Sequence, residues 1–345
     1  MSMQFAIGID IAKDQFELRW APQGDPQTIS PSQSFANTED GLQAAHAWLL
    51  TQGVVPADSL IVMEATGVYW EACALGFHAY QYPVSVVNPA RVSAFAKTLM
   101  RRGKTDPLDA RLLVRFALTL HPERWTPPPV EMEMLQQIMR QRDATVQLRS
   151  QVKNQLHALE HHAHPSPEVV ASVRRILTTL DTEIAQLEHQ FTTILHGQPA
   201  WQSMLDRIMS IAGVGLVIAG TILTETNALA TFGASSQLCA YAGITPVPFQ
   251  SGTSVHRKDR ISKIGNPRLR KALYQAAVCA IRCCEPFRTF YQRLLDHKKP
   301  KKVALVAVAR KILRVIFALV KQGTTFDPAY RSKSKKFHFF LDRRI

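Results

Sequence analysis

Hydrophobic positions in the first 90 residues fall into short blocks, most of which suit β-strands. The segments that fit a strand are residues 4–11, 14–21, 28–35, 60–66 and 84–89. Helices are expected at residues 40–50 and 69–80, where the apolar spacing changes. An opening meander followed by alternating strands and helices is typical of an α/β sheet with helices on its faces.

Helical periodicity dominates the middle of the chain. Three consecutive prolines at residues 127–129 indicate a domain boundary. Two long helices follow, and in the second the apolar residues recur in steps of four and three from Val173 to Ile194. This spacing predicts a coiled-coil seam. We therefore divide the chain into an α/β domain (1–126), a helical coiled-coil hairpin (127–198) and a C-terminal domain (199–345).

The C-terminal domain is expected to be all-α. Residues 209–215 contain two glycines and precede an apolar helix, which favours a helix-hairpin-helix. An irregular loop rich in glycine and proline is expected around residues 243–252. Two basic helices (267–296 and 301–321) and a basic tail (331–345) complete the chain. The predicted fold class is thus α/β plus all-α.

The charge of the chain is concentrated near its end. The 345 residues carry a net charge of +14, and residues 252–345 alone hold 24 basic against 5 acidic residues. A polyanion is therefore the expected partner, either nucleic acid or an anionic membrane surface. The apolar stretch at residues 303–320 contains three basic residues, so we expect a packed helix there rather than a membrane span.

Cysteine usage and the start of the chain bear on the compartment. Five cysteines are an odd number, and none are paired in a Cys-x-x-Cys motif. We expect them to be buried and reduced. The first residues lead directly into a strand, with no basic and apolar segments of a signal peptide. A cytoplasmic protein is predicted.

Four acidic residues stand at positions suited to a metal site. Asp10 interrupts the apolar first strand, Glu64 lies in a later buried strand, and Asp106 and Asp109 share the first turn of a helix. Carboxylate oxygens are the ligands that Mg²⁺ prefers, and two such ions support phosphoryl transfer. The competing interpretation is that Asp106 and Asp109 simply cap their helix.

A serine lies among many cations further on. Ser251 is in the predicted loop, and the basic residues that follow are candidates for binding phosphates. With the two glycines of the predicted helix-hairpin-helix, the candidate nucleic-acid-binding residues are Gly213, Gly215, Arg257, Lys258, Arg260, Lys263, Arg268, Arg270 and Lys271. Ser254 and Ser262 are alternative nucleophiles on the same grounds, and a serine before glycine is ordinarily a turn residue.

Several motifs resemble one known family. IGIDIAK (7–13), EATGVYW (64–70), VVNP (86–89) and KTDPLDA (104–110) are similar to the N-terminal domain of Piv/MooV-type DEDD transposases and site-specific DNA invertases. GVGLVIAGTIL (213–223), residues 241–274 and FDPAY (326–330) resemble the C-terminal transposase domain of that family. The likeness covers nearly the whole chain, in the family's motif order.

The resemblance implies a fold and a chemistry. It implies a RuvC-like, ribonuclease H-type domain with Asp10, Glu64, Asp106 and Asp109 as ligands of Mg²⁺, for which Mn²⁺ is a possible substitute. It implies Ser251 as the nucleophile that becomes joined to DNA. The partners it implies are DNA (element ends and target), a structured non-coding guide RNA, and further copies of the chain in a dimer or tetramer.

Two other functions stay open at this point. A RuvC-like structure-specific nuclease would use the same acids to hydrolyse DNA with water, without a covalent intermediate. An RNA-binding assembly protein with a vestigial fold would need neither metal nor serine. The first differs from a recombinase by its independence of Ser251, and the second by its independence of metal.

Overall fold

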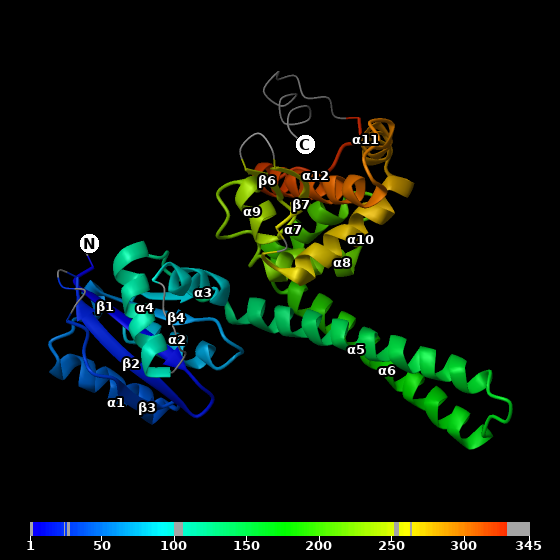
Figure 1. Cartoon of the computed structure of the whole chain (residues 1–345). Coiled ribbons are helices and arrows are strands. Elements are labelled where there is room, and N and C mark those ends of the chain that lie inside the picture. Colours follow the sequence, from blue (N-terminus) through cyan, green and yellow to red (C-terminus); the bar gives the residue numbers. More distant parts are fainter. Residues whose placement is uncertain are drawn as a thin grey trace. The chain divides into compact units, whose positions relative to one another are not determined.

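The computed structural model divides the chain into two compact units, Met1–Pro127 and Pro128–Ile345 (Figure 1). The residues that it describes are 3–23, 25, 28–99, 106–251, 255–262 and 264–329, with the side chains of all of these except 106–108, 247–251 and 255–260. The predicted basic tail and residues 104–105 of the KTDPLDA motif lie outside the described residues. The three-part division made from the sequence stays a prediction.

The N-terminal unit contains the strands and helices that the apolar pattern predicts. Its strands are β1 (Phe5–Ile11), β2 (Gln15–Pro22), β3 (Gln33–Ala36), β4 (Ser59–Glu64) and β5 (Val84–Val87). Its helices are α1 (Glu39–Thr51), the short 3₁₀ helix η1 (Pro56–Asp58), α2 (Trp70–Ala79), α3 (Pro89–Thr98) and α4 (Asp106–Leu120). Strand β3 begins later than expected, after Pro31, because a proline has no N–H for the strand ladder.

One mixed sheet of five strands organises this unit, in the order β3-β2-β1-β4-β5. β1, β2 and β3 form an antiparallel meander, whereas β1, β4 and β5 are parallel. The backbone N–H of Ala12 donates to the carbonyl of Gln15 at 2.9 Å and closes the tight turn between the first two strands. The α/β class expected from the sequence is confirmed.

Side chains alternate between the two faces of the sheet, and each face has its own core. Ile7 and Ile9 of β1 are buried on the face covered by α1 and α2. Ala6 of β1 and Val62 of β4 are buried on the other face, under α3 and α4 (Figure 1). Even-numbered residues of β1 and β4 therefore face α4.

Gly8 of β1 allows α4 to lie directly on the sheet. A Cβ atom at Gly8 would come within 2.3 Å of the carbonyl oxygen of Ala110 and 2.6 Å of the amide nitrogen of Val114. Both neighbours are backbone atoms in the middle of a packed helix, so they have little freedom to retreat. The absence of a side chain at Gly8 thus sets the distance between α4 and the strand that carries Asp10.

Gly8→Ala is expected to lower the free energy of unfolding of the N-terminal unit by about 1–3 kcal/mol, because an added methyl group overpacks the contact with α4. Tryptophan fluorescence during urea denaturation can follow this unit, which holds Trp20, Trp48, Trp70 and Trp125 of the five tryptophans. Gly215→Ala is the control, because a Cβ there meets nothing within 4 Å. Equal midpoints for Gly8→Ala and the unmodified protein would contradict the account.

The C-terminal unit is mostly helical. Its helices are α5 (Val130–Glu160), α6 (Pro167–His196), α7 (Pro199–Met209), α8 (Leu216–Glu225), α9 (Ser235–Tyr241), α10 (Pro267–Cys283), α11 (Glu285–Asp296) and α12 (Lys301–Gln322). Its strands are β6 (Pro246–Ser251) and β7 (Val255–Ile261), which pair antiparallel. The buried core joins residues from the beginning of α5 and the end of α6, such as Leu135 and Phe191, with residues of α8, α10 and α12.

Two predictions for this unit were wrong. The expected irregular loop around Ser251 is a β-hairpin, and Pro248 lies where its register shifts between Val247 and Phe249, a position that tolerates a residue without an N–H. The expected single helix 267–296 is broken at Cys284, whose backbone is extended (φ −126°, ψ 110°). Pro286 in the first turn of α11 cannot continue a preceding helix, because it lacks the required N–H.

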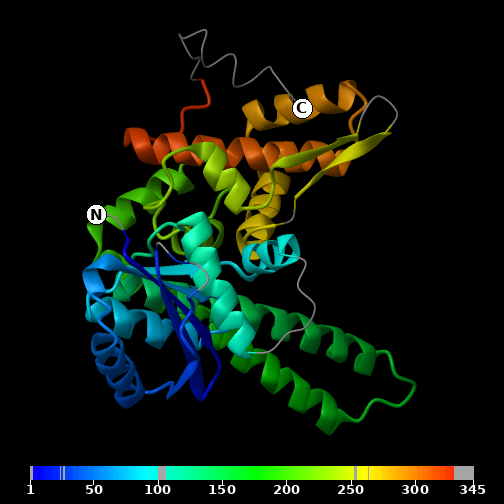
Figure 2. The same ribbon diagram turned by 60° about the vertical axis from the view of Figure 1, so that its left-hand side comes forward.

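The apolar seam predicted for α6 packs within the chain. Val173, Leu177, Ile184 and Phe191 are buried, and α6 lies beside α5 along its length (Figure 2). Ion pairs flank the seam, between Arg142 and Glu188 (2.8 Å), Arg149 and Asp181 (2.9 Å), and Arg174 and Glu160 (2.8 Å). An interface between copies of the chain would need a surface other than this seam.

The cysteines are only partly as expected. Cys73, Cys239 and Cys284 are buried, whereas Cys279 and Cys283 are exposed. The expectation of a wholly buried set was therefore wrong for the two cysteines on the outer side of α10. All five are free thiols. Within the described ranges, no helix is both long and apolar enough to cross a membrane.

Candidate functional site

Asp10 and Glu64 lie at the same edge of the sheet. β1 and β4 are parallel neighbours with Ile9 opposite Met63, and the two acids are the next residue of each strand. Both are half-buried. As even-numbered residues of these strands, they belong to the face of the sheet that α4 covers. The two carboxylates that the sequence separates by 54 positions are thus on adjacent strand ends.

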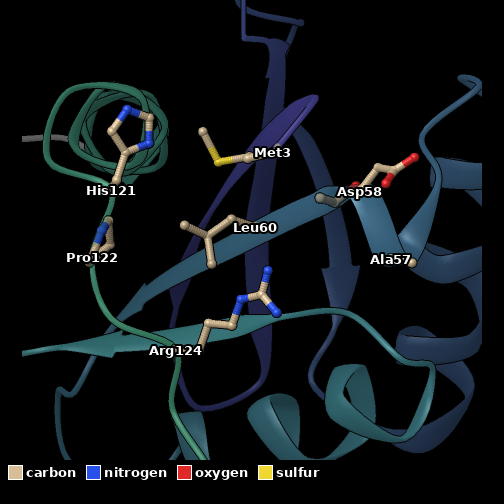
Figure 3. A pocket seen from close by; sticks show the side chains of 8 residues that line it. Met3, Ala57, Asp58, Leu60, His121, Pro122 and Arg124 are labelled. Atoms are coloured by element: carbon tan, nitrogen blue, oxygen red, sulfur yellow. The ribbon is translucent and has the colours of Figure 1, made fainter. Parts of the chain in front are cut away.

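The direction of α4 brings its first turn to this edge. His121 and Pro122, which follow α4, line a cavity of about 230 Å³ together with Met3 and Leu60 at the beginnings of β1 and β4 (Figure 3). The last turn of α4 therefore lies where these strands begin. With Ala110 packed over Gly8, the helix runs antiparallel to β1, and its first turn points toward the strand ends.

That first turn carries the other two predicted acids. Asp106 is the first residue of α4, and its side chain is outside the described residues. Asp109 is half-buried and immediately precedes Ala110, which contacts Gly8. The fold thus directs both elements that carry predicted acids, the strand ends and the start of α4, to one end of the sheet.

Glu64 has a defined local environment. The hydroxyl of Thr66 donates to Glu64 Oε1 at 2.8 Å, and the N–H of Thr66 donates to the carbonyl of Glu64 at 2.9 Å. Thr66 thus contacts both the side chain and the backbone of Glu64.

The predicted acids share one kind of donor atom. The four predicted acids would offer only oxygen donors, which suit a hard divalent cation. Among the side chains that the structure describes, no three of the His, Cys, Asp or Glu type gather closely enough to hold one metal ion. The side chain of Asp106 is not among these.

Ser251 ends strand β6. Its backbone pairs with that of Val255 across the hairpin, and residues 252–254 between them lie outside the described part of the chain. Ser254 is therefore not placed. Ser262 follows β7, and its hydroxyl donates to the carbonyl of Ile264 at 3.4 Å while its N–H donates to Thr245 at 3.2 Å. The hydroxyl of Ser262 thus has a local structural partner.

Two glycines precede α8, and they differ in their surroundings. Gly213 has a φ of +95°, and a Cβ there would come within 2.8 Å of the backbone nitrogen of Ala280 in α10. Close packing against α10 therefore explains why Gly213 has no side chain. Gly215 is exposed at the start of α8 and has no neighbour within 4 Å of an added Cβ. Of the two, Gly215 leaves backbone amides open to an anion.

The predicted basic residues fall on β7 and the beginning of α10. Arg257, Lys258 and Arg260 belong to β7, where their side chains are not described, and Lys263 lies outside the described residues. The three residues of α10 have different environments. Arg268 Nη1 is 3.8 Å from Asp143 Oδ2, and Arg270 Nη1 donates to the carbonyl of Ala242 at 3.2 Å. The side chain of Lys271 is exposed.

Further cations are partly buried on α12. Burial, together with the neighbouring Arg293, lowers the pKa of Lys311 to about 8. The Lys311 ammonium lies 4.4 Å from the centre of the Phe290 ring. Burial also lowers the pKa of Arg314 below its usual value. Part of the positive charge of the last quarter is thus packed inside it, and the exposed cations are left for a polyanion.

Two residues with close contacts near the predicted site residues were not singled out from the sequence. Gly8 had a signal, because a glycine inside a strand often marks a close backbone approach. Glu225 also had one, since this carboxylate ends an otherwise uncharged, mostly apolar helix, α8. It is only 5% exposed and contacts the residues that precede α10.

Comparison with known proteins gives two family models. One, described as the transposase IS116/IS110/IS902 family, matches residues 205–292. The other, a model of DEDD transposases of IS110 type, matches residues 7–165 and so contains all four predicted acids. Together the two models cover more than two thirds of the chain.

Curated relatives match along most of their length. The pilin gene-inverting protein of Moraxella bovis is 29% identical over 322 residues, which is 93% of this chain and 97% of that protein. The transposase for insertion sequence element IS1111A of Coxiella burnetii is 24% identical over 93% of this chain and 90% of its own. A probable family 20 transposase of Pseudomonas aeruginosa is 23% identical over 93% of this chain and 98% of its own.

These matches confirm the resemblance drawn from the motifs. Transposases and DNA invertases act on DNA, and a DEDD-type domain suggests dependence on a divalent metal ion. Both models and the relatives identify an enzyme of DNA recombination rather than a membrane-surface protein. The chain belongs to the IS116/IS110/IS902 family of insertion-sequence transposases.

Proposed function

We propose that this protein is an insertion-sequence recombinase that cuts and exchanges DNA strands through a metal-assisted serine nucleophile. Its N-terminal unit would be a RuvC-like, ribonuclease H-type domain, and its C-terminal unit would supply Ser251. The observation that carries the proposal is the register of β1 and β4, because it brings Asp10 and Glu64 to adjacent strand ends on the α4 face.

Magnesium is the ion that we propose for the acids. Asp10, Glu64, Asp106 and Asp109 would hold it, and their oxygen-only chemistry supports that choice over a softer metal. When bound, Mg²⁺ would neutralise charge that develops on the reacting phosphate and on the leaving oxygen. Mn²⁺ has similar ligand preferences and is expected to substitute.

Ser251 would carry the covalent step. Its Oγ atom attacks the phosphorus of a DNA phosphodiester, the bond from phosphorus to one sugar oxygen breaks, and that sugar leaves as a free hydroxyl after taking up a proton. The serine hydroxyl loses its proton in the same step, so charge and atoms balance. Attack by the hydroxyl of another strand on the serine phosphodiester reverses the chemistry and joins the new partner.

Cations of the C-terminal unit would hold the nucleic acid. We propose that the set named from the sequence, namely Arg257, Lys258, Arg260, Lys263, Arg268, Arg270 and Lys271, contacts phosphates, with Gly213 and Gly215 in a helix-hairpin-helix loop. Gly215 is supported by its open position at the start of α8. Neutralising several phosphates makes binding steeply dependent on salt.

The partners that we propose are element-end DNA, target DNA and a structured non-coding guide RNA. The inverting activity named for the Moraxella bovis relative supports reciprocal exchange between two DNA sites. Two duplexes must be held together for this exchange, so we propose a dimer or tetramer.

The proposal is tested by strand exchange between two DNA duplexes with the purified full-length protein and the RNA that copurifies with it. We expect recombinant product with Mg²⁺, none with a chelator, and recovery when Mg²⁺ is restored, because the divalent ion would supply the charge that stabilises the reacting phosphate. Ribonuclease treatment before DNA is added should abolish exchange between specific sites. Recombination that persists in the chelator would overturn the role of the acids, and recombination that persists after ribonuclease would overturn the guide.

A further inference from the structure

Glu225 is a buried carboxylate within a highly basic unit. It is the last residue of α8 and is 5% exposed. The other nine residues of this helix are uncharged. Thr224 and Thr226 on either side are also buried, and their hydroxyls bond back to the carbonyls of Gly220 and Ile222. Those threonines are satisfied within their own helix, whereas Glu225 reaches outward to other elements.

Three hydrogen bonds occupy the Glu225 carboxylate. Arg140 of α5 donates from Nε to Oε1 at 2.9 Å and from Nη2 to Oε2 at 3.1 Å, a two-point contact. Asn266 donates from Nδ2 to Oε2 at 2.7 Å. The carboxylate therefore connects α5 and α8 to the residue that begins α10.

The capping bonds of Asn266 fix the orientation of its amide, whose nitrogen also lies 3.5 Å from the hydroxyl oxygen of Tyr241. Asn266 Oδ1 accepts from the backbone N–H of Arg268 at 2.9 Å and of Leu269 at 3.0 Å, which caps α10. The amide nitrogen must then face Glu225, and a nitrogen that donates needs an acceptor there. A glutamate satisfies both Arg140 and Asn266, because an ionised carboxylate only accepts.

Asn266 also determines the base of the β6–β7 hairpin. Its N–H donates to the carbonyl of Tyr241 at 2.7 Å. The preceding Gly265 has a φ of +132°, and a Cβ atom there would come within 2.2 Å of the same carbonyl oxygen. The segment after β7 is thus fixed to the segment before β6. Ser251 lies at the far end of this hairpin, so its position follows from how the base is held.

We propose that Glu225 is a positioning residue for the serine-bearing hairpin, acting through Asn266. This inference rests on the proposed function of Ser251. The Glu225 side of this ion pair is buried and the Arg140 side chain is 45% exposed. Neither exposed nor buried ion pairs contribute much net stability, so stability alone does not account for this one. What the pair provides is a fixed direction for Asn266, and hence a fixed hairpin base on which the nucleophile is aligned.

The test exchanges donor and acceptor between the two residues. Glu225→Gln places an amide nitrogen against the donors of Arg140 or Asn266, and we expect the single-turnover rate of serine–DNA adduct formation to fall by about a hundredfold, the effect of misplacing a reacting group by roughly 1 Å. Binding of DNA should be unchanged, since the basic residues remain. In the double variant Glu225→Gln with Asn266→Asp, the aspartate still caps α10 and accepts from the glutamine, so the rate should recover to within about tenfold of the original.

Glu160→Gln is the matched control. Glu160 ends α5 and pairs with Arg174 of α6 at 2.8 Å, at the end of the α5–α6 pair that is remote from Asn266, so its loss should leave the rate of adduct formation unchanged. Amide hydrogen exchange supplies a readout without activity, with faster exchange expected across β6, β7 and the first turn of α10 in Glu225→Gln and protection restored in the double variant.

The outcomes separate this inference from the proposed function. If the unmodified protein forms no adduct at Ser251, the proposed function fails and the positioning role falls with it. If the adduct forms and Glu225→Gln matches the unmodified rate, or the double variant is no faster than the single one, the positioning role alone is overturned. A Glu225→Gln protein that fails to fold still leaves the double variant, which must fold and react if the exchange of partners is correct.

Discussion

Ser251→Ala is expected to abolish the covalent protein–DNA adduct and to lower strand exchange by at least about 10⁴-fold, as removal of an enzymatic nucleophile generally does. The alanine lacks the oxygen that attacks phosphorus, whereas the acids and the cations that hold DNA are unchanged. DNA binding should therefore stay within about twofold of its original affinity. Denaturing gels of labelled element-end DNA measure the adduct, and a strand-exchange assay measures the product.

Ser262→Ala is the control for this change. Ser262 belongs to the same segment, and its hydroxyl donates to the carbonyl of Ile264 within that segment. We expect this variant to form the adduct at the original rate. An adduct that persists in Ser251→Ala and disappears in Ser262→Ala would transfer the nucleophile to Ser262. Cleavage without any adduct in the unmodified protein would favour the hydrolytic RuvC-like nuclease instead.

Asp10→Asn is expected to lower cleavage and strand exchange by about 10³-fold, because a neutral amide loses the charge through which a carboxylate holds a divalent cation, an effect of several kcal/mol on the transition state. The side chain keeps its size, so β1 should remain paired with β2 and β4. Mn²⁺ should restore part of the activity at concentrations where Mg²⁺ does not, since it binds nitrogen and oxygen donors more tightly. Rates measured across a titration of each metal test this prediction.

Asp58→Asn provides the same chemical change at the opposite end of the sheet. Asp58 lines the cavity where β1 and β4 begin, and its backbone carbonyl, which accepts from Gln4, is retained in the variant (Figure 3). We expect unchanged rates and an unchanged requirement for metal. If Asp10→Asn and Asp58→Asn behave alike, the acids at the strand ends are not the catalytic ones.

Asp10 and Glu64 could be found from the sequence because each interrupts or ends a regular run of apolar residues. Asp10 interrupts alternating isoleucines, and Glu64 follows a run of buried residues, so both had to lie at strand ends or to have a reason to be buried. Their adjacency could not be read from the sequence, because it depends on the parallel pairing of β1 with β4. That pairing needs a long-range contact which local patterns do not encode.

The environment of Ser251 was harder to predict for a local reason. Pro246 and Pro248 argue against a strand, since proline removes ladder hydrogen bonds, and only the register shift at Pro248 makes the pairing with β7 feasible. The break at Cys284 was missed because the apolar spacing of α10 and α11 continues across it. There the signal was Pro286, whose local effect outweighs the periodicity.

The contacts of Glu225 show a second limit of prediction from sequence. A carboxylate at the end of an apolar helix indicates a buried polar partner, and the sequence offers many candidate donors in this basic unit. That Arg140 and Asn266 are those donors follows from three elements packing together. Local patterns identify the unusual residue, and only the tertiary fold identifies what it contacts.

The most direct measurement traps the reaction of the purified protein with Mg²⁺, element-end DNA and copurifying RNA, then maps the DNA-linked peptide by mass spectrometry. The account predicts a single nucleotide-bearing peptide with the phosphate on Ser251, and no such peptide from Asp10→Asn. A linkage at another residue, or cleaved DNA with no linked peptide at all, would contradict it.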